Sequence, residues 1–239
     1  MAYCPRTCLE NWSCKTSAHD PLTDVSYIVF NLTQAPGYIG YSASRNAIIV
    51  SFRGSSNIQN WIENFNFEKV PYLFCLRCEV HAGFFADYAA VEATVNNKVQ
   101  GLLNKYPTAK VVTTGHSLGG ALAMIAGMEL KRVFNIDVEI HHFGAPRVGN
   151  PNLARHINNR IPNIYRVVHH KDIVPHLPPD LPEFDYHHSA YEIFWDADFT
   201  EYKTCGSSGE DKSCSNQFFP DYSAADHDTY FIKMSSPQC

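Results

Sequence analysis

A serine lies between two glycines in Gly115-His116-Ser117-Leu118-Gly119, which matches the pattern Gly-x-Ser-x-Gly. The apolar run Val111–Thr114 precedes the motif, and a helical pattern that extends to about Val133 follows it. In this strand–turn–helix setting the serine occupies a strained turn, and glycines on either side avoid collisions with the adjoining strand and helix. The pattern therefore predicts that Ser117 is a nucleophile, in preference to a simple turn residue before a helix.

A serine hydroxyl needs a base to remove its proton, and the base is usually a histidine that a carboxylate orients. On turns of this kind the acid follows the serine along the chain, and the histidine follows the acid. Asp172 comes directly after a predicted strand, Ile164–His169, and is the favoured acid. His176 lies in the same loop as Asp172, so the residues alone leave three histidines open as the base: His187, His188 and His227.

The elements that must position these groups alternate between strands and helices. After the serine motif, strands are predicted at Val138–Phe143 and Ile164–His169, with a helix over Asn152–Asn159 between them. This alternation implies parallel pairing through crossover helices, hence an α/β sheet, and an early hairpin makes the sheet mixed. The other predicted elements are strands at Val25–Leu32, Tyr38–Ser44, Ala47–Phe52 and Tyr191–Trp195 and a helical region over Gly83–Tyr106. No boundary is evident, so one domain over residues 1–239 is expected.

Charge and cysteine content narrow the class of protein. The net charge of −5 and the pI of about 6.2 argue against nucleic acid as the main partner, and no run of 18 uncharged apolar residues could span a membrane. The eight cysteines favour disulfides and an oxidising compartment, with zinc binding at Cys75-x-x-Cys78 as the weaker alternative. Glycosylation sequons at Asn11 and Asn31 and a polar start like that of a mature protein fit a secreted chain.

Further motifs surround the serine turn in a fixed order. They are IIVSFRGSSNIQNWIENFNF, Cys75-x-x-Cys78 followed by EVHAGF, VVTTGHSLGGALA, FGAPRVGN, YRVVHHKDIVPHLPP, FDYHHSAYEIFW and AADHDTYF. Together they resemble the secreted class 3 lipases of the filamentous-fungal type over most of the chain from residue 38 onward. The resemblance implies an α/β-hydrolase fold with a mixed, mostly parallel sheet, crossover helices and a short helical lid.

The resemblance also assigns the site residues. It places the acid on Asp172 in HKDIVPHLPP and the base on His227 in DHDTYF. It implies an oxyanion hole made by the backbone N–H of Leu118 and by the N–H and hydroxyl of Ser55, donors preset where negative charge develops. The alternative for Ser55 is a turn hydroxyl that bonds to a local amide. The chemistry needs neither a metal ion nor an organic cofactor, and none is expected.

The cysteine pairing is likewise implied by the resemblance. It pairs Cys75 with Cys78, Cys205 with Cys214, Cys4 with Cys239 and Cys8 with Cys14. Two features depart from the family pattern. Three cysteines fall within the first fourteen residues, and Asp228 stands where the family often has an apolar residue that faces the acyl pocket.

As a function, the resemblance implies a secreted, extracellular triacylglycerol lipase. Such an enzyme would be a monomer that cleaves acylglycerol esters at an oil–water interface through an acyl-enzyme on Ser117, with only peripheral contact to the lipid surface. Three alternatives are a soluble-ester esterase of the feruloyl-esterase type, a phospholipase A1 on the same fold, and a catalytically inactive binding module.

The segment at about residues 57–67 favours the lipase. At helical spacing one face of this segment is apolar and the other is polar. The residues of the apolar face are Ile58, Trp61, Ile62 and Phe65. So short a helix cannot form a core by itself, and it is predicted to be a lid that covers a cleft in water and turns outward on lipid. The alternative is a helix that packs permanently on the body of the protein.

Overall fold

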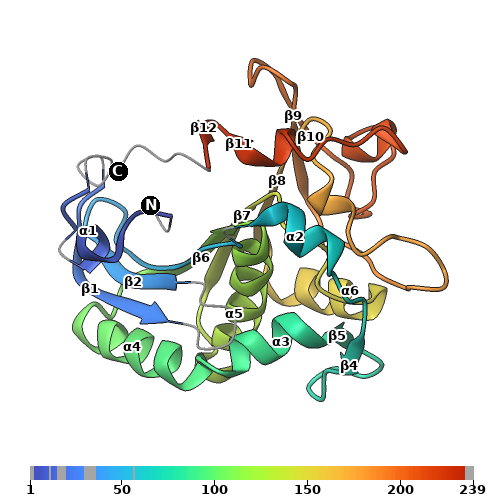
Figure 1. Cartoon of the computed structure of the whole chain (residues 1–239). Coiled ribbons are helices and arrows are strands. Elements are labelled where there is room, and N and C mark those ends of the chain that lie inside the picture. Colours follow the sequence, from blue (N-terminus) through green and yellow to red (C-terminus); the bar gives the residue numbers. More distant parts are fainter. Residues whose placement is uncertain (1–2, 11, 15–19, 30–35, 56, 235–239) are drawn as a thin grey trace.

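A mixed eight-stranded sheet forms the centre of the molecule in the computed structural model, which describes residues 3–10, 12–14, 20–29, 36–55 and 57–234 (Figure 1). The strands lie in the order β1 (Leu22–Val29), β2 (Pro36–Ser42), β3 (Ala47–Phe52), β6 (Lys110–His116), β7 (Val138–Phe143), β8 (Asn163–His169), β9 (Glu192–Trp195) and β10 (Tyr202–Thr204). The five strands from β3 to β9 pair in parallel, and β1, β2 and β10 pair antiparallel at the two sides. The predicted mixed, mostly parallel α/β sheet is therefore confirmed.

The central helix α5 (Leu118–Phe134) lies against β6, β7 and β3. Its first thirteen residues, Leu118–Leu130, are all buried, because small side chains on this helix allow close contact with the sheet. The helix ends at Asn135, which has the left-handed backbone conformation common after helix C-termini. The other helices are α1 (Arg6–Glu10), α2 (Ile58–Glu63), α3 (Ala82–Ala89), α4 (Glu92–Lys105) and α6 (Pro151–Arg160).

Short elements complete the described chain. They are the strand pairs β4 (Lys69–Pro71) with β5 (Glu79–His81) and β11 (Thr229–Tyr230) with β12 (Ile232–Lys233), and the 3₁₀ turns η2 (Val174–His176), η3 (Ser215–Phe218) and η4 (Asp226–Asp228). Strands of two or three residues are too short to show an alternating pattern, so the sequence did not reveal them. Within the described ranges, none of the helices combines the length and apolar character that crossing a bilayer requires.

The region predicted to be helical, Gly83–Tyr106, forms two helices, α3 and α4, which are separated at Ala90 and Val91. Val91 and Val95 are both buried, so the apolar spacing continues across the break. Periodicity alone therefore could not reveal the change in direction. The first strand also begins earlier than predicted, at Leu22 rather than Val25.

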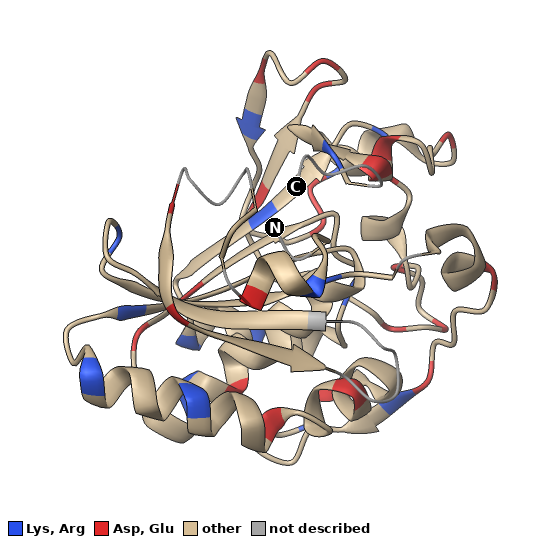
Figure 2. Cartoon of the chain, turned by 60° about the vertical axis from the view of Figure 1, so that its left-hand side comes forward, with Lys and Arg blue, Asp and Glu red and all other residues tan. Residues whose placement is uncertain are grey.

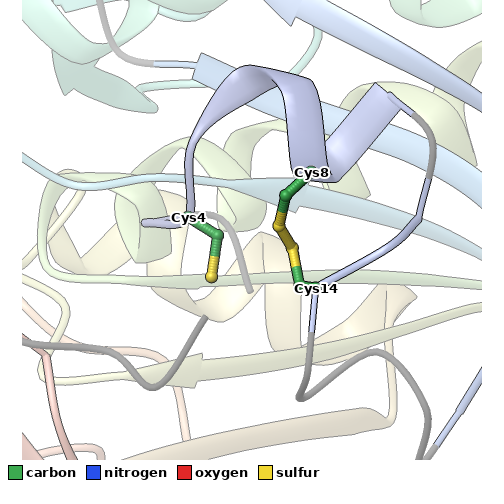
Figure 3. A group of neighbouring side chains, drawn as sticks. All are labelled: Cys4, Cys8 and Cys14. Atoms are coloured by element: carbon green, nitrogen blue, oxygen red, sulfur yellow. A yellow bond between two sulfur atoms is a disulfide. The ribbon is translucent and has the colours of Figure 1, made fainter.

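Three of the predicted disulfides are present, Cys8–Cys14, Cys75–Cys78 and Cys205–Cys214. Figure 3 shows the bond between Cys8 and Cys14, with Cys4 close by. The Cys75–Cys78 bond replaces the alternative of a zinc site at this pair. Cys239 lies outside the described residues, as do the sequon residues Asn11 and Asn31, so the Cys4–Cys239 pair and glycosylation stay predictions.

Backbone contacts between glycines set the junction of β6, α5 and β3. A Cβ atom on Gly115 would lie 2.2 Å from the carbonyl oxygen of Gly119. A Cβ atom on Gly119 would lie 2.3 Å from the carbonyl oxygen of Phe52. Both distances are far below van der Waals contact, so this junction requires glycine at both positions.

The Gly115→Ala substitution is expected to lower the free energy of unfolding by about 3 kcal/mol or more, because the rigid backbone of α5 must move to admit a methyl group. Gly101→Ala is the matched control. Gly101 lies exposed within α4, where an added Cβ meets nothing within 4 Å, so alanine should raise stability by up to about 1 kcal/mol. Urea unfolding followed by circular dichroism measures both changes. Equal stability of the two variants would contradict the argument.

Candidate active site

Ser117 forms the turn between β6 and α5 with φ 59° and ψ −131°. Left-handed φ in a residue other than glycine costs of order 1–3 kcal/mol and persists only where the surroundings hold it. The Ser117 N–H donates to the carbonyl of Phe143 (2.9 Å), and the Ser117 carbonyl accepts from the N–H of Gly120 (2.9 Å). The side chain is 1% exposed, and its Oγ has no hydrogen-bond partner within the described residues.

Asp172 and His227 lie together although they are far apart in sequence. Nδ1 of His227 is 2.9 Å from each carboxylate oxygen of Asp172, and both side chains are buried. An Nδ1–H that donates to the carboxylate leaves Nε2 of His227 as the acceptor, which is the tautomer a base requires. This Nε2 is buried and, within the described part of the chain, makes no hydrogen bond.

Further donors satisfy the carboxylate of Asp172. The backbone N–H of Val174 donates to Oδ1 (2.9 Å), and the hydroxyl of Tyr230 donates to Oδ2. A buried carboxylate without such partners would be strongly disfavoured. The sequence analysis did not predict a role for Tyr230. The available signal was its place three residues after His227 in the motif AADHDTYF.

The other candidate histidines have different surroundings. His187 Nε2 lies 2.7 Å from the carbonyl oxygen of Ser208, and His188 Nε2 lies 2.6 Å from that of Pro175. The ring of His176 stacks on Tyr222, with centroids 3.9 Å apart. Among the histidines that follow Asp172, it is His227 that the structure brings onto its carboxylate.

His116 connects the nucleophile strand to the loop of His227. Its ring stacks on that of His227 with centroids 4.5 Å apart, and its Nε2–H donates to the His227 carbonyl (2.9 Å). Nδ1 of His116 then accepts from the hydroxyl of Tyr3 (2.8 Å). Burial and the neighbouring His227 hold the pKa of His116 well below its ordinary value, which keeps this ring neutral. The sequence did not indicate this chain of bonds, because it joins residues more than 100 positions apart.

The turn that carries Ser55 lies directly against the nucleophile turn. A Cβ atom on Gly54 would lie 2.7 Å from the His116 carbonyl oxygen and 2.9 Å from Cβ of Ser117. In this conformation the Ser55 hydroxyl donates to the carbonyl of Asn57 and accepts from its N–H, both at 3.2 Å. The hydroxyl thus makes local turn bonds beside the nucleophile. Leu118, whose N–H is the other predicted donor, is the first residue of α5 and is buried.

The predicted lid is helix α2, capped at its start by the side chain of Asn57. Its three apolar residues and Phe65, which follows the helix, are half-buried, and its polar residues are exposed, so the predicted amphipathic pattern is confirmed. Trp61 contacts Phe65 and Phe84, with centroids 4.3 Å and 6.3 Å apart, and Phe65 stacks on His81 at 5.1 Å. The apolar face of α2 therefore rests on the start of α3 without becoming fully buried.

Three groups among the described residues have the spacing of metal ligands. They are Cys4 with Cys8 and Cys14, Glu192 with Cys205 and Cys214, and Asp180 with His187 and Glu210. The first two contain disulfide-bonded cysteines. In the third, both oxygens of Glu210 are paired with Arg147 at 2.7 Å, so its charge is already compensated by an ion pair.

Asp87 lies on α3, one turn beyond the Phe84 ring that supports α2. Its side chain is buried, and this desolvation raises the pKa of the carboxyl group from 3.8 to about 6. A carboxyl whose pKa is higher in the folded than in the unfolded chain contributes less stability as pH rises through that interval. The ionised form of Asp87 is thus a cost to the fold at neutral pH.

The Asp87→Asn variant is expected to be more stable than the unchanged chain at pH 7, by about 1–3 kcal/mol. The gain should shrink as pH falls below about 6 and vanish below about 4, where the carboxyl is protonated in both states. Thermal unfolding of both proteins between pH 3 and pH 8 measures the difference. A gain that is independent of pH would contradict the assignment to ionisation.

Comparison with known proteins identifies the family to which this chain is similar. The model of the family Lipase (class 3) matches residues 49–181. The lipase of Rhizopus oryzae is 36% identical over 204 residues, which are 84% of this chain and 52% of that protein. The secreted mono- and diacylglycerol lipase 1 of Fusarium solani is 36% identical over 201 residues, which are 81% of this chain and 59% of that protein. The chain spans about half the length of the curated relatives it matches.

Solved structures agree over nearly the whole chain. The lipase from Rhizopus microsporus var. chinensis superposes with a TM-score of 0.88 at 36% identity, covering 98% of this chain and 84% of that chain. A triacylglycerol lipase whose catalytic centre is formed by a serine protease triad superposes with a TM-score of 0.88 at 32% identity, covering 98% of this chain and 92% of that one. The α/β-hydrolase fold expected from the motifs is confirmed.

Proposed function

The chain belongs to the class 3 lipase family, and from that membership we propose that it is a secreted, extracellular carboxylic ester hydrolase that forms an acyl-enzyme on Ser117. The observation that supports the proposal most directly is the paired Asp172 and His227 beside a strained Ser117, with His227 Nε2 left free of hydrogen bonds among the described residues. A catalytically inactive binding module has no need of such an arrangement.

In the proposed reaction, Oγ of Ser117 attacks the ester carbonyl carbon while its proton moves to Nε2 of His227. Asp172 holds the imidazole in the required tautomer and stabilises the imidazolium that forms. The tetrahedral intermediate expels the alcohol, which takes the proton from His227. A water molecule, activated by His227 in the same way, then releases the fatty acid from Ser117.

Negative charge develops on the former carbonyl oxygen during both steps. We assign its stabilisation to the N–H of Leu118, at the amino end of α5, and to Ser55. The Ser55 hydroxyl must leave its local bonds with Asn57 to reach that oxygen, which a small movement of the turn that leads into α2 can supply. Loss of one such donor typically costs about 10²–10³ in rate.

Acylglycerols are the substrates we favour. Similarity to a triacylglycerol lipase and to a mono- and diacylglycerol lipase supports this class. The half-buried apolar stripe on α2 and the residues after it supports it as well. Its members are Ile58, Trp61, Ile62 and Phe65, and Trp61 and Phe65 can exchange their contacts with Phe84 of α3 for contacts with lipid. The enzyme would act as a monomer, with peripheral contact to the lipid surface.

A soluble-ester esterase is the second candidate, with phospholipase A1 activity as a variant of the first. One observation favours the esterase. Trp61 and Phe65 already pack on aromatic rings of α3 and on His81, as a permanently docked helix would. Kinetics at an interface separate the two candidates.

The Asp172→Asn variant is expected to lose about 10³–10⁴-fold in hydrolysis rate on p-nitrophenyl butyrate while it folds normally, because the amide favours the wrong tautomer of His227. Asp221→Asn is the matched control: this carboxylate is exposed and pairs with Lys171 close to the same loop, so its loss should change the rate less than twofold. An Asp172→Asn variant with near-native rates would show that another residue supports the base.

Hydrolysis of tributyrin across its solubility limit tests the lipase proposal. The rate is expected to rise steeply once droplets form, because the interface offers the apolar face of α2 an alternative to α3. Ser117→Ala should abolish the activity on both sides of the limit. Equal hydrolysis rates below and above the solubility limit, together with strong activity on soluble aromatic esters, would favour the esterase instead.

A further inference from the structure

An exposed aromatic cluster lies where the hairpin of β9 and β10 meets the ribbon of β11 and β12. Its members are Trp195, Phe199, Tyr202, Phe231 and the neighbouring Ile232, which we term the aromatic rim. Trp195 contacts Phe231, Phe199 and Tyr202, with ring centroids 5.1 Å, 5.9 Å and 5.0 Å apart, and Phe199 contacts Phe231 at 4.7 Å. Trp195 and Phe199 are half-buried and form the base. The outer members are exposed, Tyr202 by 64%, Phe231 by 53% and Ile232 by 50%.

Sheet topology places the rim on the same edge as the proposed nucleophile and acid. Strand β9 runs parallel to β8, with Trp195 opposite His169 in the register. The carboxyl ends of parallel strands share one edge of a sheet, and Ser117 and Asp172 follow β6 and β8 at that edge. Figure 1 shows the loop between β9 and β10 projecting outward from the end of these strands, with β11 and β12 nearby.

The rim is also joined directly to the loop that carries His227. The ring of Phe199 stacks on His169, with centroids 4.2 Å apart. Nδ1 of His169 bonds to the carbonyl oxygen of Asp226 (2.9 Å), next to His227. A molecule or surface seated on the rim would therefore lie beside the catalytic loop.

The charges around the rim indicate which kind of lipid surface could bind there. The tip of the hairpin carries three acidic residues, Asp196, Asp198 and Glu201, and Lys203 follows on β10 (Figure 2). Lys233 follows Ile232 and lies 4.0 Å from the carboxylate of Asp228, so acidic groups outnumber basic ones around the rim. Because the whole chain also carries a net charge of −5, an anionic bilayer would be repelled. Tyrosine and tryptophan favour the boundary between lipid and water, since their rings are apolar at one end and polar at the other. An uncharged lipid surface matches both properties.

We propose that the aromatic rim is a docking surface for an uncharged acylglycerol–water interface and holds the catalytic edge of the sheet against it. This inference rests on the proposed lipase function, because the lipid phase is where such a substrate resides. The rim would give the enzyme a second lipid contact besides α2, at the edge of the sheet. The rim would seat the enzyme before or while α2 moves.

The test measures binding without turnover. In a Ser117→Ala background, the Tyr202→Ser/Phe231→Ser double variant is expected to bind trioctanoin emulsion droplets roughly tenfold or more weakly than the parent, by flotation. Both side chains are more than half exposed, and equal thermal unfolding midpoints of variant and parent would show that the fold is kept.

A matched control comes from the other end of α5. Leu73 and Leu76 are 87% and 89% exposed on the β4–β5 loop. In the same loop, the centroid of the Phe74 ring lies 4.0 Å from the guanidinium carbon of Arg132. Arg132 is in the last turn of α5, roughly 22 Å along the helix from Ser117. A Leu73→Ser/Leu76→Ser variant should bind the droplets within twofold of the parent.

Three results would overturn the proposal. The first is droplet binding by the rim variant within twofold of the parent, or an equal loss in the Leu73/Leu76 control. The second is stronger binding of the parent to phosphatidylglycerol vesicles than to trioctanoin droplets. The third is a dimer, detected by light scattering, that the rim substitutions dissociate, since the rim would then bind a second copy.

The outcome is separable from that of the lipase proposal. A chain that binds droplets through the rim but hydrolyses no tributyrin would overturn the proposed activity and leave the docking surface in place. A chain that hydrolyses tributyrin while the rim substitutions leave binding unchanged would overturn the docking surface alone.

Discussion

The close contact of three backbone segments at Gly115 and Gly119 is the constraint on which the rest of the site depends. With no side chain at either position, β6, α5 and the end of β3 approach to distances that a Cβ atom would forbid. This contact holds Ser117 at φ 59° and brings the Gly54–Ser55 turn against it. The nucleophile and the proposed oxyanion turn are thus positioned by the core of the sheet, whose low mobility maintains the strain.

The site also requires a buried carboxylate, Asp172, and a buried imidazole, His227, at the edge of the sheet where the parallel strands end. Asp172 is stable there because His227, Tyr230 and the N–H of Val174 all donate to it. His116 ties the carbonyl of His227 back to β6, which places the proton on Nε2 of His116, and the hydroxyl of Tyr3 donates to the Nδ1 that remains. Among the described residues, the two atoms of this network that the proposed reaction uses, Oγ of Ser117 and Nε2 of His227, are left without a hydrogen-bond partner.

Around this centre, two groups of apolar side chains are not fully buried. Helix α2 keeps its apolar residues half-buried on aromatic rings, and the aromatic rim keeps three side chains at least half exposed. Elements with few fully buried contacts open at low free energy, whereas α5 does not. A firm sheet edge bordered by half-buried and exposed apolar groups fits the proposed action on a substrate that forms a separate phase.

Some of these features could be predicted from sequence because they are local. The strand, turn and helix around Ser117, the alternation that implies a parallel sheet and the stripe on residues 57–67 are all encoded by spacings of a few residues, which hydrophobic period and glycine sterics report directly. The choice of His227 from the residues alone stayed open among three histidines, and only similarity of motifs resolved it. The break between α3 and α4, the donors Tyr230 and Tyr3 and the aromatic rim became evident only in the tertiary structure. The two donors and the rim depend on contacts between segments distant in the chain, and those contacts follow from the order of strands in the sheet rather than from any local pattern.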